Sequence, residues 1–262
     1  MHKITIFAAA VTVIALIGFF HHDVYAISYE IKDKDSCQSL SESSSWNSTT
    51  NTCSIIGVAS LTLGENSLTI KNGITLVLNG SSIVNNGTMI NHGTINIGQI
   101  IKSGIASGSI INHGTVINYG TIAIGTSNKS LGGGGSIANN GGTIKNHGII
   151  NVIGNIYNNS GILNNFNTIN IGSNTVRGPG SVSNFATLNN YGVIAIFSPG
   201  GLGNEGTMNN KGTIQNGGFI GNYNVINNFD TINNSEAFTD YCGATVNNFG
   251  TLSGNPINNI PC

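Results

Sequence analysis

The chain has 262 residues, only 7% of them charged, and a formal net charge of −1. So little positive charge excludes nucleic acid and anionic membranes as electrostatic partners, since both require a basic surface. Glycine is abundant, with 37 residues, but it does not recur at every third position and only 4 prolines are present, which excludes collagen. Regularly recurring Ile, Val and Thr argue against disorder.

Residues 1–26 have the features of a secretory signal peptide. Lys3 supplies the positive charge, Ile4 to Phe20 form the apolar segment, and Val24-Tyr25-Ala26 fits a cleavage site. The alternative is an uncleaved membrane anchor, although the apolar run is short for a spanning helix and a polar His-His-Asp stretch follows it. We expect cleavage, and no later segment is apolar enough to span a membrane.

Two pairs of cysteines lie near the two ends of the predicted mature chain. Residues 27–60 contain Cys37 and Cys53, separated by a serine-rich run, and residues 242–262 begin and end with Cys242 and Cys262. Four cysteines allow three pairings, and proximity in the sequence favours 37 with 53 and 242 with 262. Four free thiols, the alternative, are typical of a reducing compartment. We therefore expect an N-terminal cap and a C-terminal coil and cap, each closed by a disulfide.

Residues 61–241 carry an internal repeat with a period of six. Apolar residues recur at every sixth position, as at Ile83, Met89 and Ile95. Residues six apart on a helix lie about 120° apart around its axis, so this period excludes an apolar helical stripe. Alternation of apolar and polar residues within each unit indicates short strands. Each unit also contains Asn-x-Gly or a variant, whose glycine we expect to adopt a left-handed backbone at a turn.

Pairs of the form Ile-x-Ile or Ile-x-Val show how these units group, because their first residues lie between 19 and 28 residues apart. A coil of about 18 residues with an optional insertion accounts for this variation, since solenoid insertions fall in loops on one side. Gly98 marks the point where the insertions leave the stack. The pairs begin at Ile95, Ile122, Ile150, Ile169 and Ile194. The predicted insertions are Gln99–Gly108, Thr126–Gly135, Gly154–Gly161, Ser173–Gly180 and Phe197–Gly201.

These patterns predict an all-β, single-stranded parallel β-helix of about eight to ten coils at the usual strand spacing. The apolar residues fill a narrow interior, and the threonine that precedes each of them points outward. Asparagines at equivalent corners can stack into amide ladders along the axis. Open ends would expose unpaired strand edges, and the two cysteine-bearing caps are suited to cover them.

The repeats NNGTM from Asn85, NHGTI from Asn91 and NYGTI from Asn118, with the lead-in SSWNSTTNTCSI at residues 44–55, resemble those of Asn/Gly-rich β-solenoid cell-surface proteins of archaea and bacteria. The resemblance covers most of the predicted mature chain. It implies a pectin-lyase-like, right-handed parallel β-helix at the cell surface. It carries over no catalytic residues.

The distribution of reactive residues argues against an enzyme. Between Lys71 and Asn204 the chain contains no Asp or Glu, whereas polysaccharide-active β-helices cluster carboxylates on one face. The glycine run Gly132–Gly135 is not followed by the Gly-Lys-Ser/Thr that a phosphate loop requires. We therefore expect no catalytic residue, no cofactor and no metal site.

Three histidines, His92, His113 and His147, share the context Asn-His-Gly. If they stacked, they could form an imidazole ladder that binds a metal, and His92 and His113 are separated by about one coil. Tyr, Lys and Phe occupy the same slot elsewhere in the repeat. We therefore interpret the slot as an exposed corner position.

Outward-facing polar residues are the remaining candidates. Threonines such as Thr88 and Thr94 could form ranks of the kind that bind ice, but an exposed strand position accounts for them. Among the N-x-[ST] sequons, we expect Asn47 and Asn128 to be glycosylated, because both lie in predicted loops. The other sequons begin at Asn79, Asn86, Asn158 and Asn233.

The sequence therefore predicts an exported, non-catalytic β-solenoid that serves as a structural or adhesive protein, extracellular or at the cell surface. Its polar, uncharged surface of Asn, Thr and Tyr suits glycans or self-association with a like solenoid. The alternative is a carbohydrate-binding or polysaccharide-active β-helix. Assembly into fibres through uncapped ends is a third hypothesis.

Overall fold

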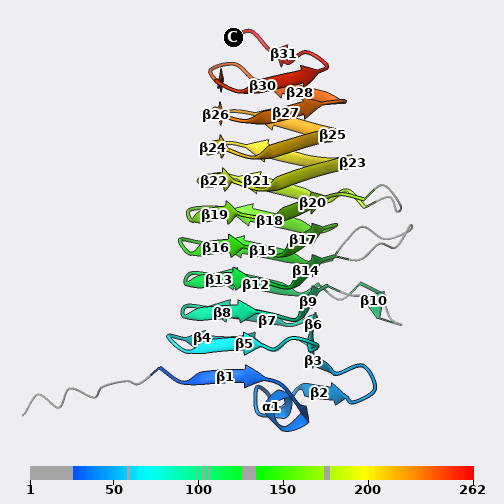
Figure 1. Cartoon of the computed structure of the whole chain (residues 1–262). Helices are drawn as coiled ribbons and strands as arrows, with labels where there is room; N and C mark the ends of the chain where they lie inside the picture. The colour runs from blue at the N-terminus through cyan, green and yellow to red at the C-terminus, as the bar shows by residue number, and fades with distance from the viewer. Residues whose placement is uncertain are drawn as a thin grey trace, which may run out of the picture.

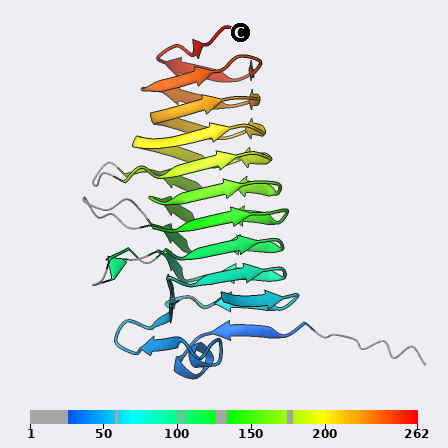
Figure 2. The ribbon, with the colours of Figure 1, turned by 180° about the vertical axis from the view of Figure 1, so that it is seen from behind.

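The strands stack as successive coils of a parallel β-solenoid (Figures 1 and 2). The computed structural model describes residues 26–57, 60–98, 100–101, 104–105, 107–125, 134–173 and 178–262. The predicted signal peptide, apart from its last residue, lies outside the described residues. In the part of the chain that is described, no helix is long and apolar enough to cross a membrane.

Each coil has three strands, and we name the three faces first, second and third in the order in which the chain visits them. The second face is a 10-stranded sheet, which agrees with the predicted number of coils. The first and third faces form one 19-stranded sheet, because two long strands, β23 and β25, run through the corner that joins them. The second face contains β1 (Ser28–Ile31), β5 (Ser67–Ile70), β8 (Thr88–Asn91), β13 (Thr115–Asn118), β16 (Thr143–Asn146), β19 (Ile162–Asn165), β22 (Thr187–Asn190), β24 (Thr207–Asn210), β26 (Val225–Asn228) and β29 (Thr245–Asn248).

The remaining strands belong to the larger sheet, to a hairpin and to the base of the stack. On the first face lie β4 (Ser60–Gly64), β7 (Ser82–Asn85), β12 (Ser109–Asn112), β15 (Ser136–Asn139), β18 (Asn155–Asn158), β21 (Ser181–Asn184), β28 (Ala237–Asp240) and β31 (Asn258–Asn259). On the third lie β3 (Thr52–Ile56), β6 (Thr75–Asn79), β9 (Thr94–Ile97), β14 (Thr121–Ile124), β17 (Ile149–Val152), β20 (Thr168–Ile171), β27 (Thr231–Asn234) and β30 (Thr251–Gly254). The two corner-spanning strands are β23 (Val193–Asn204) and β25 (Thr213–Asn222), and β10 (Ile100–Ile101) pairs with β11 (Gly104–Ile105) as an antiparallel hairpin.

The interior is a column of mostly aliphatic side chains at the second position of the strands that form the coils. Several strands of the third face bury their fourth residue as well, as at Ile97 and Ile124. Ile83, Met89 and Ile95 are at most 1% exposed, as the six-residue period predicts. Burial of each such side chain stabilises the fold by roughly 1.5–3 kcal/mol. The period continues through Ile137 and Ile144, where one extra residue lengthens the turn and hides the repeat from a strict count of six.

The insertions leave the stack at the corner that follows the third face. Gly98, Gly125 and Gly172 occupy this corner with φ values of 71°, 77° and 76°, as expected where the chain departs from the coil. The predicted insertion Gly154–Gly161 is wrong: β18 lies inside this range and pairs in register with both β15 and β21. The segment Phe197–Gly201 is a register shift within β23.

The glycines of the Asn-x-Gly corners have a different role from the predicted one. Gly120 and Gly148 do not have positive φ, so the expected left-handed turn is wrong at these positions. A Cβ atom on Gly120 would lie 2.0 Å from the carbonyl oxygen of Gly93, and one on Gly148 would lie 2.1 Å from that of Gly120. These corners need glycine because adjacent coils approach closely.

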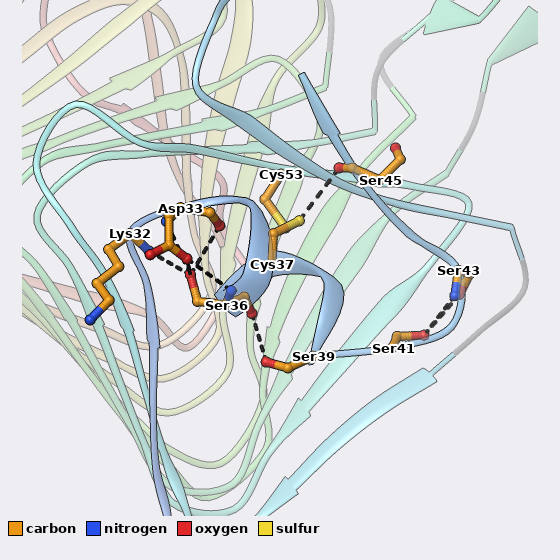
Figure 3. Close-up of a disulfide and its surroundings, with 9 residues drawn as sticks. All are labelled: Lys32, Asp33, Ser36, Cys37, Ser39, Ser41, Ser43, Ser45 and Cys53. Carbon is orange, nitrogen blue, oxygen red and sulfur yellow. Dashed lines mark hydrogen bonds between the residues drawn. A yellow bond between two sulfur atoms is a disulfide. The ribbon is translucent and has the colours of Figure 1, made fainter. Parts of the chain in front are cut away.

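The base of the stack is closed by α1 (Lys34–Gln38) and by β2 (Ser44–Asn47), which pairs antiparallel with β3. The predicted disulfide between Cys37 and Cys53 joins the helix to β3, with a Cα–Cα distance of 5.6 Å (Figure 3). Asp33 caps the helix. A hydrogen bond from the Ser36 hydroxyl and a second from the Ser36 backbone N–H lower the pKa of Asp33.

The other end carries the second predicted disulfide, between Cys242 and Cys262. It holds the final segment across β28, to which β31 pairs. Both disulfides match the predicted pairing. Two disulfides in one chain indicate an oxidising compartment, because cytosolic thiols are normally kept reduced.

Candidate functional site

Asparagines at the fourth strand position form buried ladders at the corners after the first and second faces. In each ladder the side-chain Nδ2 donates to the Oδ1 of the asparagine one coil further along. Asn165 accepts from Asn146 at 2.8 Å and donates to Asn190 at 2.8 Å and to the carbonyl of Val193 at 2.9 Å. The ladder asparagines from Asn85 to Asn228 are at most 1% exposed, and only the terminal Asn248 is exposed. They hold coils together and are unavailable to a ligand, which removes much of the asparagine that we expected on the binding surface.

The two long ladders begin and end at recognisable positions. The coil below Asn85 and Asn91 has Gly64 and Ile70 at the equivalent positions, so the two Oδ1 atoms that start the ladders have no hydrogen-bond partner among the described residues. The ladder after the first face ends at Asp240, whose carboxylate accepts from Asn222 at 2.7 Å. A shorter ladder after the third face joins Asn216 to Asn234.

The fifth position of each unit is an exposed corner slot, and the slots after the second face form a column of aromatic and basic side chains. We call this set the aromatic column. Neighbouring rings are stacked, with centroids 4.6–5.2 Å apart from His92 to Tyr191, and Lys211 lies over the Tyr191 and Phe229 rings at 5.7 and 5.9 Å. Most ring faces are therefore covered by neighbours, and the edges face solvent. The column consists of His92, Tyr119, His147, Phe166, Tyr191, Lys211, Phe229 and Phe249.

The histidines do not form an imidazole ladder. His92 and His147 belong to the aromatic column and are separated by Tyr119. His113 lies at the other corner, where its Nδ1 is 2.8 Å from the carbonyl oxygen of Asn140. Each coil has one such slot after the first face and another after the second face. Residues with the same local sequence can therefore lie at different corners. Among the described residues, no group of three His, Cys, Asp or Glu side chains could hold a metal ion.

The slots after the first face contain a second aromatic pair, which the sequence analysis missed. The rings of Tyr223 and Tyr241 stack with their centroids 4.1 Å apart and an interplanar angle of 8°. A hydrogen bond between the two phenols raises the pKa of Tyr223, with smaller contributions from burial and from the charges of Tyr241 and Glu205. The signal in the sequence is the separation of 18 residues, one coil without an insertion.

The second face carries an outward rank of asparagines at the third strand position. Asn189 donates to Asn164 at 2.9 Å and accepts from Asn209 at 2.9 Å, and the rank continues through Asn227 to Asn247. These residues are mostly half-buried, so each amide retains access to solvent. Threonines precede several of these asparagines at the first strand position; Thr187 and Thr207, for example, pair directly and are half-buried. The predicted Thr88 and Thr115 also pair directly, but their strands carry isoleucine at the third position.

The described surface has shallow depressions rather than a deep cleft among its pockets. Three of them have volumes of about 350, 420 and 460 Å³, and their described lining residues include no Asp or Glu. The third is lined by Ser82, Ser109, Ser136, Asn155 and Tyr157 on the first face.

Five of the six sequons, all but the one at Asn128, begin within the described residues. Asn47 is the last residue of β2, so its predicted placement in a loop is wrong; it is nevertheless exposed, and its Oδ1 accepts from the backbone N–H of Thr49. Asn158 is fully buried in a ladder, so its sequon is inaccessible in the folded protein. Asn128 lies outside the described residues.

Comparison with protein-family models, with curated proteins and with solved structures found no match for this chain. The β-solenoid architecture and the asparagine ladders rest on the structure itself. Membership of the Asn/Gly-rich cell-surface type remains a prediction from the repeats.

Proposed function

We propose that this chain is an exported, non-catalytic β-solenoid that serves as a structural or adhesive rod at the cell surface. The main support for the proposal is that asparagine, the commonest polar residue of the chain, forms buried ladders inside the stack. Asn146, Asn165 and Asn190 each bridge successive coils, and the same arrangement recurs along the stack. In such a chain most asparagine side chains join one coil to the next, which favours a continuous, stiff rod.

The location follows from two independent features. The first 26 residues read as a secretory signal. The two disulfides indicate an oxidising compartment, which an exported chain reaches. The location is tested by treating intact cells of the source with an impermeant protease and by probing the medium. Protection of the protein in intact cells, together with its absence from the medium, would contradict a surface or extracellular role.

The partner that we favour is a neutral glycan bound on the second face. The outward asparagine rank offers an amide donor and an acceptor on five successive coils, from Asn164 to Asn247, and sugar hydroxyl groups can pair with both. This surface also supports the alternative function of a carbohydrate-binding module. Self-association through the same face is the competing outcome.

A glycan array distinguishes these outcomes. We expect wild-type protein to bind a subset of neutral glycans, and the double variant Asn189→Ala/Asn209→Ala to lose that binding. Asn170→Ala is the matched control, because Asn170 occupies the equivalent outward position on the third face and donates to Asn151 at 2.9 Å. If the wild-type protein binds no glycan but sediments as oligomers, the partner of this face is a second copy of the chain and not a glycan.

A further inference from the structure

Tyr223 and Tyr241 are placed in a geometry that no other described tyrosine shares. Their rings lie on adjacent coils, nearly parallel and 4.1 Å apart between centroids. Tyr119 stacks on His92 and His147, and Tyr191 contacts Phe166 and Lys211. Among the described tyrosines, Tyr223 and Tyr241 are therefore the pair whose two phenol rings are in contact.

Both rings are open to reagents from solvent. Tyr223 is 47% exposed and Tyr241 is half-buried. They stand at a corner rather than inside the stack, so a small tilt can bring their ortho carbons together without moving the coil backbones. Tyr241 is followed directly by Cys242, which is already joined to Cys262.

We propose that Tyr223 and Tyr241 form a site for oxidative cross-linking, in which hydrogen peroxide and a haem peroxidase join them as dityrosine. Each phenol loses one electron and one proton to the peroxidase, which gives two phenoxyl radicals. The radicals couple through a new carbon–carbon bond between ortho positions, and transfer of the two ortho protons to the two ring oxygens restores both phenols. The balance is two tyrosines and one hydrogen peroxide to one dityrosine and two waters.

Proximity is the physical reason that this pair should react before others. Holding two reacting groups in contact replaces an encounter between molecules with an intramolecular step, which raises the effective concentration by many orders of magnitude. The product would fasten the last complete coil to the coil below it, beside the Cys242–Cys262 disulfide. An oxidising compartment is also where such a modification would persist.

The test uses the full, disulfide-intact protein treated with peroxidase and limiting hydrogen peroxide. We expect dityrosine fluorescence in the monomer band of a denaturing gel. After reduction, cleavage at Glu236, which lies between the two tyrosines, should leave the peptides that contain Tyr223 and Tyr241 joined. Mass spectrometry should show the joined peptides with the loss of two hydrogens.

Conservative variants separate this site from random oxidation. Tyr223→Phe and Tyr241→Phe keep the ring stack but should reduce the monomer fluorescence by about tenfold or more, because the intramolecular partner is lost. Tyr119→Phe and Tyr191→Phe should leave it unchanged. Fluorescence confined to dimers, or undiminished in Tyr241→Phe, would overturn the proposal. Failure of the proposed surface function would not affect this outcome, since the reaction is measured on the isolated protein.

Discussion

At the scale of single residues, the repeat is explained by two side-chain types with different tasks. Asparagine at the fourth strand position is buried because each amide finds both a donor and an acceptor in neighbouring coils. Glycine at the corner is required because a carbonyl of the preceding coil occupies the space of a Cβ atom. Neither requirement can be met by a residue that is merely polar or small.

Asn165→Ala should lower the free energy of unfolding by about 1–3 kcal/mol, because the substitution leaves the buried Oδ1 of Asn190 without its donor and removes one of the two hydrogen bonds that Asn146 Nδ2 donates. Urea denaturation followed by circular dichroism measures the change. The neighbouring Asn164→Ala is the control: Asn164 points outward, and its loss should cost less than about 0.5 kcal/mol. Equal effects of the two substitutions would contradict the ladder as a stabilising element.

Gly172→Ala should destabilise the protein by about 1–3 kcal/mol, since the residue has a left-handed backbone that alanine tolerates poorly. A Cβ atom there would also lie 2.4 Å from the carbonyl oxygen of Phe197. Gly203→Ala is the matched control, because a Cβ atom at that position meets nothing within 4 Å. Thermal unfolding of the two variants side by side gives the comparison, and a stable Gly172→Ala would refute the close approach at this corner.

At the scale of elements, the corner columns show how exposed aromatic residues stabilise a stack of strands. The rings of the aromatic column lie one above another because parallel strands in register repeat their side chains at the strand spacing. Rings with covered faces cannot stack on a sugar, so the column is better suited to holding coils together than to binding a glycan. The glycan proposal therefore rests on the second face.

Phe166→Ala should reduce stability by about 1–2 kcal/mol, because it removes ring contacts with His147 at 4.6 Å and with Tyr191 at 5.1 Å. Phe185→Ala is a close control: Phe185 is 43% exposed against 42% for Phe166, but none of the described rings stacks on it. Chemical denaturation of both variants measures the difference. If Phe185→Ala costs as much, ring stacking contributes nothing beyond ordinary contact.

At the scale of the whole molecule, the two ends of the stack are closed in different ways. Cys37 and Cys53 are 0% exposed and lie within the core, whereas Cys242 and Cys262 are exposed. The N-terminal disulfide is therefore part of the packed base, and the C-terminal one is an external clasp over a single strand.

This difference predicts the order of reduction. A mild thiol reductant should open Cys242–Cys262 first, because a thiolate must reach the sulfur that it attacks. Alkylation at successive times, followed by mass spectrometry, should label Cys242 and Cys262 well before Cys37 and Cys53. Hydrogen exchange should then increase at β31 and β28, with the base of the stack unchanged. Simultaneous labelling of all four cysteines would show that the base opens as readily as the clasp.

The sequence by itself determined the period, the strands, the interior residues and the cysteine pairing. These are local or repeated features: an apolar residue such as Ile95 alternates with polar neighbours, and a period of six fits strands but not a helix. The asparagine ladders were also predictable, because equal spacing places like residues on equal corners.

Only the tertiary structure decided which residues meet from one coil to the next. Insertions of different lengths change the number of residues from one coil to the next, so His92 stacks on Tyr119 rather than on His113. The segment from Gly154, which was expected to be an insertion, contains a regular strand. The pair Tyr223 and Tyr241 is likewise set by register. The physical reason is that hydrogen bonding between coils, and not distance along the chain, fixes which side chains share a corner.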